Sequence, residues 1–148
     1  MKLLIIEDET AAAQNLRSIL KSVTPEAEVV DVIDTVVDSV EWFENNPMPD
    51  LVFMDIQLSD GESFKIFDKV KITCPVVFTT AYDQYALKAF EVNSIDYLLK
   101  PINEQGVRRA VDKWRNLTGV DRSNYTARVD TMVAEQKTLR QSFLVRFR

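Results

Sequence analysis

The stretch "LVFMDIQLSDG", residues 51–61, places an aspartate directly after four apolar residues. A continuous apolar run of this length is typical of a strand buried on both faces, as in a parallel sheet. Asp55 would then lie at the carboxyl end of that strand, where the chain leaves the sheet. Either Asp55 marks only the point at which the strand surfaces, or the strand serves to deliver a carboxylate to the edge of the sheet.

Four further apolar runs recur along the chain: "KLLII" (2–6), "AEVVDVI" (27–33), "PVVFTT" (75–80) and "DYLL" (96–99). The segments between the runs have helical periodicity. Four apolar stripes mark helices: Leu16, Ile19, Leu20 and Val23; Val36, Val40 and Phe43; Phe64, Phe67 and Val70; and Val107, Val111 and Trp114. A further short helix is expected in "DQYALKAFEV", between the third and the last of these. Strand–helix alternation repeated five times predicts a doubly wound α/β domain, a five-stranded parallel sheet flanked by five helices.

The ends of the predicted elements are marked by local signals. Thr10, Asp83 and Asn103 stand where helix N-caps are expected. The domain covers residues 1–118, and residues 119–141 form a polar linker with helical periodicity. The last residues, "SFLVRFR" (142–148), alternate apolar and basic side chains like the first strand of an effector domain. We therefore expect a longer protein that is truncated here after its linker, with a natural tail as the alternative.

Composition excludes several classes of function. The 148 residues carry 23 acidic and 18 basic side chains, a net charge of −5, which does not suit a surface that neutralises DNA phosphates. With no histidine and one cysteine, Cys74, the chain lacks Ser-His-Asp, Cys-His and zinc-type sites. The single cysteine and the lack of a signal peptide or long apolar run predict a cytoplasmic protein with no membrane contact.

Polar side chains follow four of the predicted strands: Glu7, Asp8 and Glu9 the first, Asp55 the third, Thr79 and Thr80 the fourth, and Lys100 the fifth. In a doubly wound sheet these strand ends share one edge, where ligands bind. Clustered carboxylates repel one another unless a cation compensates them, and an oxygen-only ligand set suits Mg²⁺ or Mn²⁺. A lysine and a threonine hydroxyl facing such a cluster favour a phosphoryl group, with Asp55 as its nucleophile.

Each of these residues also has an ordinary structural explanation. Glu9 is expected to be a first-turn acid favoured by the helix dipole, and Asp8 taken alone could be a helix cap. Taken singly, Lys100 is most often a solvated surface lysine and Thr80 a hydroxyl satisfied by the backbone. Their joint arrival at the ends of the right strands favours a site.

The segments "LLIIEDE", "LVFMDIQL", "VVFTTAY" and "DYLLKP" resemble the signature segments of bacterial response-regulator (CheY-like) receiver domains, over residues 2–117. The resemblance implies the flavodoxin-like strand order 2-1-3-4-5. It implies that Asp55 is the phosphoacceptor, that Asp8 binds Mg²⁺ directly and that Glu7 acts partly through water. The backbone carbonyl of Gln57 would be a further metal ligand.

The resemblance assigns three more roles. Thr80 matches the switch hydroxyl, Tyr97 the switch aromatic residue and Lys100 the phosphate-binding lysine. Thr80 is preferred to Thr79 because Ala81 follows it. A cis Lys100–Pro101 bond is also implied.

The same resemblance implies a two-component regulator, not an enzyme, that catalyses only its own phosphorylation and dephosphorylation. A sensor histidine kinase would supply the phosphoryl group, and a helix 4–strand 5–helix 5 face would switch or dimerise. The short, proline-free "DIQLSDGES" and the segment "FTTAYDQYALKAFEVNSIDYLLKP" are similar to LytTR-type regulators. In those proteins an all-β DNA-binding domain follows the linker, so this chain would regulate transcription and contact DNA through a domain beyond Arg148. Tyr82 and Tyr85 would either join the signalling face or serve packing.

Three alternative functions fit the sequence less well. A haloacid-dehalogenase-type phosphatase has its nucleophile after the first strand and a second aspartate two residues on, where this chain has Gln57. A flavodoxin-like cofactor binder would have a phosphate loop after the first strand, where "EDET" would repel phosphate. A receiver-like module that no longer takes phosphate is disfavoured by the intact acid pair Glu7 and Asp8 and by Asp55, Thr80 and Lys100.

Overall fold

A five-stranded parallel sheet forms the centre of the computed structural model, which describes residues 1–82 and 94–118. Its strands are β1 (Lys2–Ile6), β2 (Glu28–Ile33), β3 (Leu51–Asp55), β6 (Val76–Thr80) and β7 (Ser94–Leu99). They lie in the order β2-β1-β3-β6-β7, with every neighbouring pair parallel. Counted along the chain, this is the order 2-1-3-4-5, which confirms the expected doubly wound fold.

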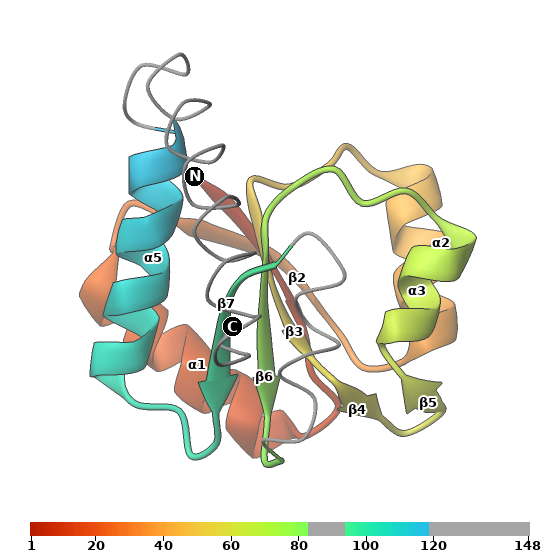
Figure 1. Ribbon diagram of the computed structural model, residues 1–148, viewed down its shortest axis with the longest axis horizontal. Coiled ribbons are helices and arrows are strands. Elements are labelled where there is room, and N and C mark those ends of the chain that lie inside the picture. Colours follow the sequence, from red (N-terminus) through yellow and green to blue (C-terminus); the bar gives the residue numbers. More distant parts are fainter. Residues whose placement is uncertain (83–93, 119–148) are drawn as a thin grey trace, which may run out of the picture.

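Helices cover both faces of the sheet (Figure 1). Helices α1 (Thr10–Val23) and α5 (Glu104–Thr118) lie on one face, and α2 (Val36–Asn45) and α3 (Phe64–Lys69) lie on the other. The fourth predicted helix, with its cap Asp83 and Tyr85, falls outside the described residues, as do the linker 119–141 and the segment 142–148. Within residues 1–82 and 94–118 there is no helix long and apolar enough to cross a membrane.

The central strands are apolar along their length because both of their faces are covered. Every residue of β3 and β6 is buried, and successive side chains point to opposite helical layers. Leu3 and Ile5 pack with α1 and α5, whereas Leu4 and Ile6 pack with α2 and α3. This packing explains the unbroken apolar runs of the sequence and fixes which residues reach the edge together.

One of the two testable helix caps was predicted correctly. Asn103 caps α5, and its Oδ1 accepts a hydrogen bond from the backbone N–H of Gly106 at 2.8 Å. The prediction for Thr10 is wrong, because Thr10 is the first residue of α1 and the cap position is Glu9, which makes no side-chain cap bond. The Glu9 carboxylate instead lies 3.2 Å from the Lys100 ammonium.

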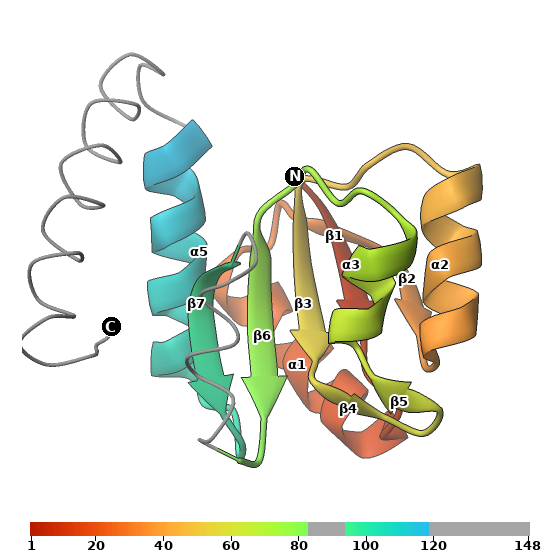
Figure 2. The same ribbon diagram turned by 45° about the vertical axis from the view of Figure 1, so that its right-hand side comes forward.

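A short hairpin follows β3 and was not predicted. Its strands β4 (Gln57–Leu58) and β5 (Gly61–Glu62) pair antiparallel, with Gln57 opposite Glu62 and Leu58 opposite Gly61. Figure 2 shows the hairpin beyond the end of β3, beside the lower end of α2. The hairpin therefore connects the carboxyl edge of the sheet to the helical layer of α2 and α3.

Candidate functional site

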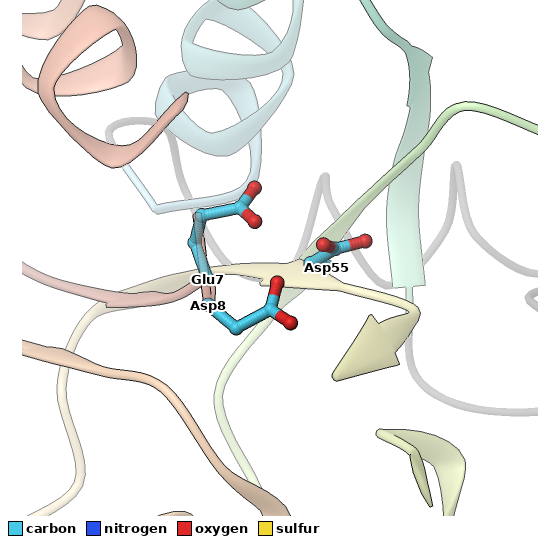
Figure 3. Close-up of side chains that lie close together, drawn as sticks. All are labelled: Glu7, Asp8 and Asp55. Carbon is cyan, nitrogen blue, oxygen red and sulfur yellow. The ribbon is translucent and has the colours of Figure 1, made fainter. Parts of the chain in front are cut away.

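Three carboxylates meet at the carboxyl edge of the sheet. Ile6 pairs with Met54 in the β1–β3 register, so Glu7 continues the row toward Asp55. Glu7 and Asp55 are 6% and 5% exposed, and Asp8 is half-buried. One carboxylate oxygen from each of the three lies within 4.8 Å of the others, and Figure 3 shows the side chains around a common space. The structure thus brings together the acidic cluster that was predicted from the strand ends.

Lys100 lies against this cluster. Its Nζ is 2.8 Å from Glu7 Oε1, 3.1 Å from Asp55 Oδ2 and 3.2 Å from Glu9 Oε1. The backbone N–H of Lys100 donates to the Thr80 carbonyl at 2.7 Å, which extends the β6–β7 pairing by one step. The Lys100–Pro101 bond that follows is cis, as expected. A lysine from the end of one strand is therefore held over acids from two others.

Burial and mutual repulsion shape the protonation of the site. Burial raises the pKa of Glu7, and the nearby Asp55 adds to this, while the Lys100 ammonium lowers it in part. Burial and the charge of Glu7 also raise the pKa of Asp8. Burial disfavours the charged form of Lys100, but its bonds to Glu7 and Asp55 outweigh that effect and raise the pKa of the ammonium. Carboxylates outnumber the one lysine here, which suits an additional cation.

The backbone after Asp55 turns back onto the site. The N–H of Ile56 donates to the Thr79 carbonyl at 3.0 Å, so one more residue continues along β6. The N–H of Gln57 then donates to Asp55 Oδ1 at 3.3 Å. Gln57, the expected carbonyl ligand, is therefore next to the predicted phosphoacceptor.

The two predicted switch residues meet at the backbone of Tyr82. The Thr80 side chain is buried, and its Oγ1 accepts a hydrogen bond from the Tyr82 N–H at 3.2 Å. The Tyr97 hydroxyl donates to the carbonyl of the same residue. Tyr97 is partly buried and packs against the apolar cluster on the α2–α3 side of the sheet. Thr79 is also buried and pairs with Asp55 in the β3–β6 register.

Glu9 is the site residue that sequence reasoning misjudged. It was expected to be an ordinary first-turn acid, but it precedes α1, and its carboxylate pairs with Lys100. Its adjacency to Glu7 and Asp8 is the one signal that could have indicated this. The pairing itself depends on a residue 91 positions later in the chain.

A doubly wound sheet with an acidic cluster of Glu7, Asp8 and Asp55 at its carboxyl edge is the arrangement expected of a receiver domain. The chain belongs to the response regulator receiver domain family, whose model matches residues 3–112. Receiver domains of this kind are parts of two-component response regulators and are generally not enzymes. Family membership decides against the phosphatase and flavodoxin-like alternatives.

The chain is similar in sequence to curated LytT and LytR proteins. The chain is 42% identical over 118 residues to the sensory transduction protein LytT of Bacillus anthracis, covering 78% of this chain and 47% of LytT. It is 34% identical over 137 residues to the transcriptional regulatory protein LytR of Staphylococcus aureus strain N315, covering 90% of this chain and 55% of LytR. The chain thus spans about half the length of these curated relatives.

Solved structures show the same fold. The response regulatory domain of mrkE from Klebsiella pneumoniae matches with a TM-score of 0.68 at 27% identity, covering 78% of this chain and 99% of that domain. The N-terminal domain of a response regulator/sensory box/GGDEF protein from Carboxydothermus hydrogenoformans matches with a TM-score of 0.69 at 28% identity, covering 87% and 99%.

Proposed function

We propose that this chain is a phosphorylation-dependent switch in which Asp55 accepts a phosphoryl group from a sensor histidine kinase in the presence of Mg²⁺. The observation that carries the proposal is the contact of the Lys100 ammonium with Asp55 Oδ2 at 3.1 Å, inside a cluster that also holds Glu7 and Asp8. A buried carboxylate beside a fixed cation is suited to receive an anionic group, because the cation can then pair with the group's oxygens.

The residues at this edge fit a hard divalent cation. The cluster offers carboxylate oxygens from Glu7, Asp8 and Asp55, and an oxygen-only donor set suits Mg²⁺ or Mn²⁺. Asp8, Asp55 and the Gln57 carbonyl would hold the ion, with Glu7 acting partly through water. When bound, the ion would neutralise the carboxylates so that an anionic phosphorus can approach Asp55.

The transfer itself is a displacement at phosphorus. A carboxylate oxygen of Asp55 forms a bond to the phosphorus while the bond from phosphorus to the imidazole nitrogen of the kinase's phosphohistidine breaks. The electron pair leaves with the imidazole, which takes up a proton. Lys100 pairs with one phosphoryl oxygen, and the Thr80 hydroxyl donates a hydrogen bond to another. Hydrolysis then resets the switch: water attacks the phosphorus, the bond from phosphorus to Asp55 breaks, and inorganic phosphate leaves.

Switching would pass through Tyr82. The Thr80 hydroxyl now accepts a hydrogen bond from the Tyr82 N–H, and the Tyr97 hydroxyl donates to the Tyr82 carbonyl. A Thr80 hydroxyl that turns toward a phosphoryl group would give up its hydrogen bond with the Tyr82 N–H, so the Tyr82 backbone and Tyr97 would change position together. Phosphorylation would thus shift the equilibrium between two arrangements of the face made by helix 4, β7 and α5.

The output would lie beyond this domain. We propose that residues 1–118 are the receiver domain, 119–141 a linker and 142–148 the start of a LytTR-type DNA-binding effector that regulates transcription in the cytoplasm. The curated relatives support this, since one is named a transcriptional regulatory protein. The exposed Leu99 on β7 lies on the face that would pair two receiver domains in a homodimer.

The experiment that tests the proposal is intact-protein mass measurement after incubation with acetyl phosphate, with and without MgCl₂. One phosphoryl adduct is expected with Mg²⁺, and none with Asp55→Asn. A matched control is Asp50→Asn, because Asp50 is an exposed acid immediately before β3. An absent adduct in the unsubstituted chain would favour the alternative of a receiver-like module that does not take phosphate.

A further inference from the structure

The hairpin that carries Gln57 has little internal support. Its ladder consists of two residue pairs, Gln57 with Glu62 and Leu58 with Gly61, and the segment 56–63 contains no proline. Two-stranded ladders are marginal in water even when they are much longer. The hairpin therefore needs contacts with the rest of the domain to keep one position.

Backbone and apolar contacts hold the base of the hairpin. The N–H of Ser63 donates to the Ile56 carbonyl at 2.8 Å and closes the loop where it leaves the sheet. The Leu58 side chain is buried in the apolar cluster of α2 and α3. Both contacts lie outside the turn between β4 and β5, at residues 59–60.

Asp60 fixes that turn. Its Oδ1 accepts a hydrogen bond from the backbone N–H of Val36 at 2.7 Å, and its Oδ2 accepts one from Val37 at 3.1 Å. Both donors lie in the first turn of α2, where backbone N–H groups lack partners within the helix. A carboxylate is favoured there by hydrogen bonding and by the helix dipole.

Helix α2 is a firm support for this contact. Val36 and Phe43 are buried in the apolar cluster against the sheet, and Thr35 caps the helix independently by accepting from the Asp38 N–H at 3.0 Å. The turn of the hairpin is thus joined to an element that is fastened elsewhere. Asp60 is three residues from Gln57 along the same hairpin.

We propose that Asp60 is a positioning residue for the metal site, which holds the hairpin on α2 so that the Gln57 carbonyl is presented beside Asp55. Without Asp60, the hairpin would sample other positions, and the carbonyl would join Asp8 and Asp55 for only part of the time. This inference rests on the proposed function, because the Gln57 carbonyl acts as a ligand only if the site takes Mg²⁺.

The test is a titration of the 148-residue chain with MgCl₂ alone, followed by the backbone amide NMR signals of Glu9 and Gln57. These amides report on the site because they donate to Glu7 Oε2 and Asp55 Oδ1, at 3.2 and 3.3 Å. Asp60→Ala is expected to weaken Mg²⁺ binding about tenfold, as the loss of an outer-shell partner of a metal site does. Asp60→Asn keeps one acceptor oxygen, so its Mg²⁺ affinity is expected to lie between those of the unsubstituted chain and Asp60→Ala.

Thr35→Ala is the matched control, since it removes the other side-chain cap of α2 without touching the hairpin. It should leave the Mg²⁺ affinity at that of the unsubstituted chain. An equal loss in Thr35→Ala and Asp60→Ala would overturn the inference, because the effect would then be one of α2 stability.

Two other outcomes are also decisive. Unchanged affinity in Asp60→Ala, or in Asp60→Asn if the alanine variant loses its native spectrum, overturns the positioning role and leaves the proposed function standing. If the Glu9 and Gln57 signals of the unsubstituted chain do not respond to Mg²⁺, the metal site of the proposed function fails, and the inference fails with it.

Discussion

Lys100→Met should show what the lysine does for the acidic cluster before any phosphate arrives. The substitution keeps most of the side-chain stem but removes the ammonium that contacts Glu7, Glu9 and Asp55 at 2.8 to 3.2 Å. Two of these carboxylates, Glu7 and Asp55, are buried and would lose their cation.

The size of the effect follows from burial. Removing one partner of a buried charge cluster costs about 3–5 kcal/mol, and the lower end applies here because the Lys100 side chain is 16% exposed and that of Glu9 is 68% exposed. We therefore expect the free energy of unfolding to fall by about 3 kcal/mol at neutral pH. For a domain of this size, this lowers the melting temperature by roughly 10 °C.

The loss should depend on pH and on Mg²⁺. Without Lys100, the pKa of Glu7 rises further above its ordinary value of 4.5, so the folded state holds a proton that the unfolded state releases. Because the pKa of Glu7 is already raised in the unsubstituted chain, the deficit of the variant should be smallest while Glu7 is protonated in both folded forms, and it should grow as the pH rises through that raised pKa. MgCl₂ should raise the melting temperature of the variant more than that of the unsubstituted chain, since it replaces the missing cation.

The assay is thermal unfolding followed by circular dichroism, with and without MgCl₂. Lys113→Met is the matched control, because Lys113 is 48% exposed and pairs with Asp96 at 3.5 Å, so its loss should change stability by less than about 1 kcal/mol. Equal melting temperatures for Lys100→Met and Lys113→Met, or a deficit that Mg²⁺ leaves unchanged, would refute the reasoning.

Three further predictions concern other parts of the fold. The Thr24 hydroxyl and Arg115 lower the pKa of Glu26 to about 2 from 4.5. In urea unfolding, the difference in stability between the unsubstituted chain and Glu26→Gln should therefore be largest above pH 4.5 and vanish toward pH 2, and a constant difference would contradict this. Burial raises the pKa of the Cys74 thiol to about 12, so iodoacetamide at about pH 8 should label the unfolded chain but not the folded one, as mass measurement would show. Gly61 has φ +140°, so Gly61→Ala should lower the free energy of unfolding by about 1–3 kcal/mol; a variant as stable as the parent would argue against the turn.

The strands were the most predictable part of the structure. "KLLII" matches β1 and "LVFM" matches β3 to within one residue, because strands covered on both faces leave unbroken apolar runs. β7 was less well predicted and begins at Ser94, two residues before the "DYLL" run. It lies at the edge of the sheet and is only partly buried, so its first residues include polar ones that the apolar pattern did not mark.

The convergence of Glu7, Asp8, Asp55 and Lys100 could be predicted because it follows from topology. In a parallel sheet, the carboxyl ends of the strands share an edge, whatever the loops do. The individual partners could not be predicted in the same way. Asp60 contacts backbone groups 23 and 24 residues earlier in the chain, and no spacing rule connects them.

The hairpin was missed for a related reason. Its strands have two residues each, too short for an alternating pattern to be recognised. The N-cap of α1 was misassigned because the side chain at that position, Glu9, is engaged by Lys100 rather than by the helix. In both cases, a long-range contact determines the local structure.

The central claim is that Asp55 receives the phosphoryl group. The most direct measurement phosphorylates the chain with acetyl phosphate and Mg²⁺, digests it at acidic pH and locates the adduct by peptide mass analysis. The adduct is expected on the peptide that contains Asp55, and hydroxylamine should remove it, because hydroxylamine cleaves acyl phosphates. An adduct on a peptide without Asp55, or one that resists hydroxylamine, would contradict the claim.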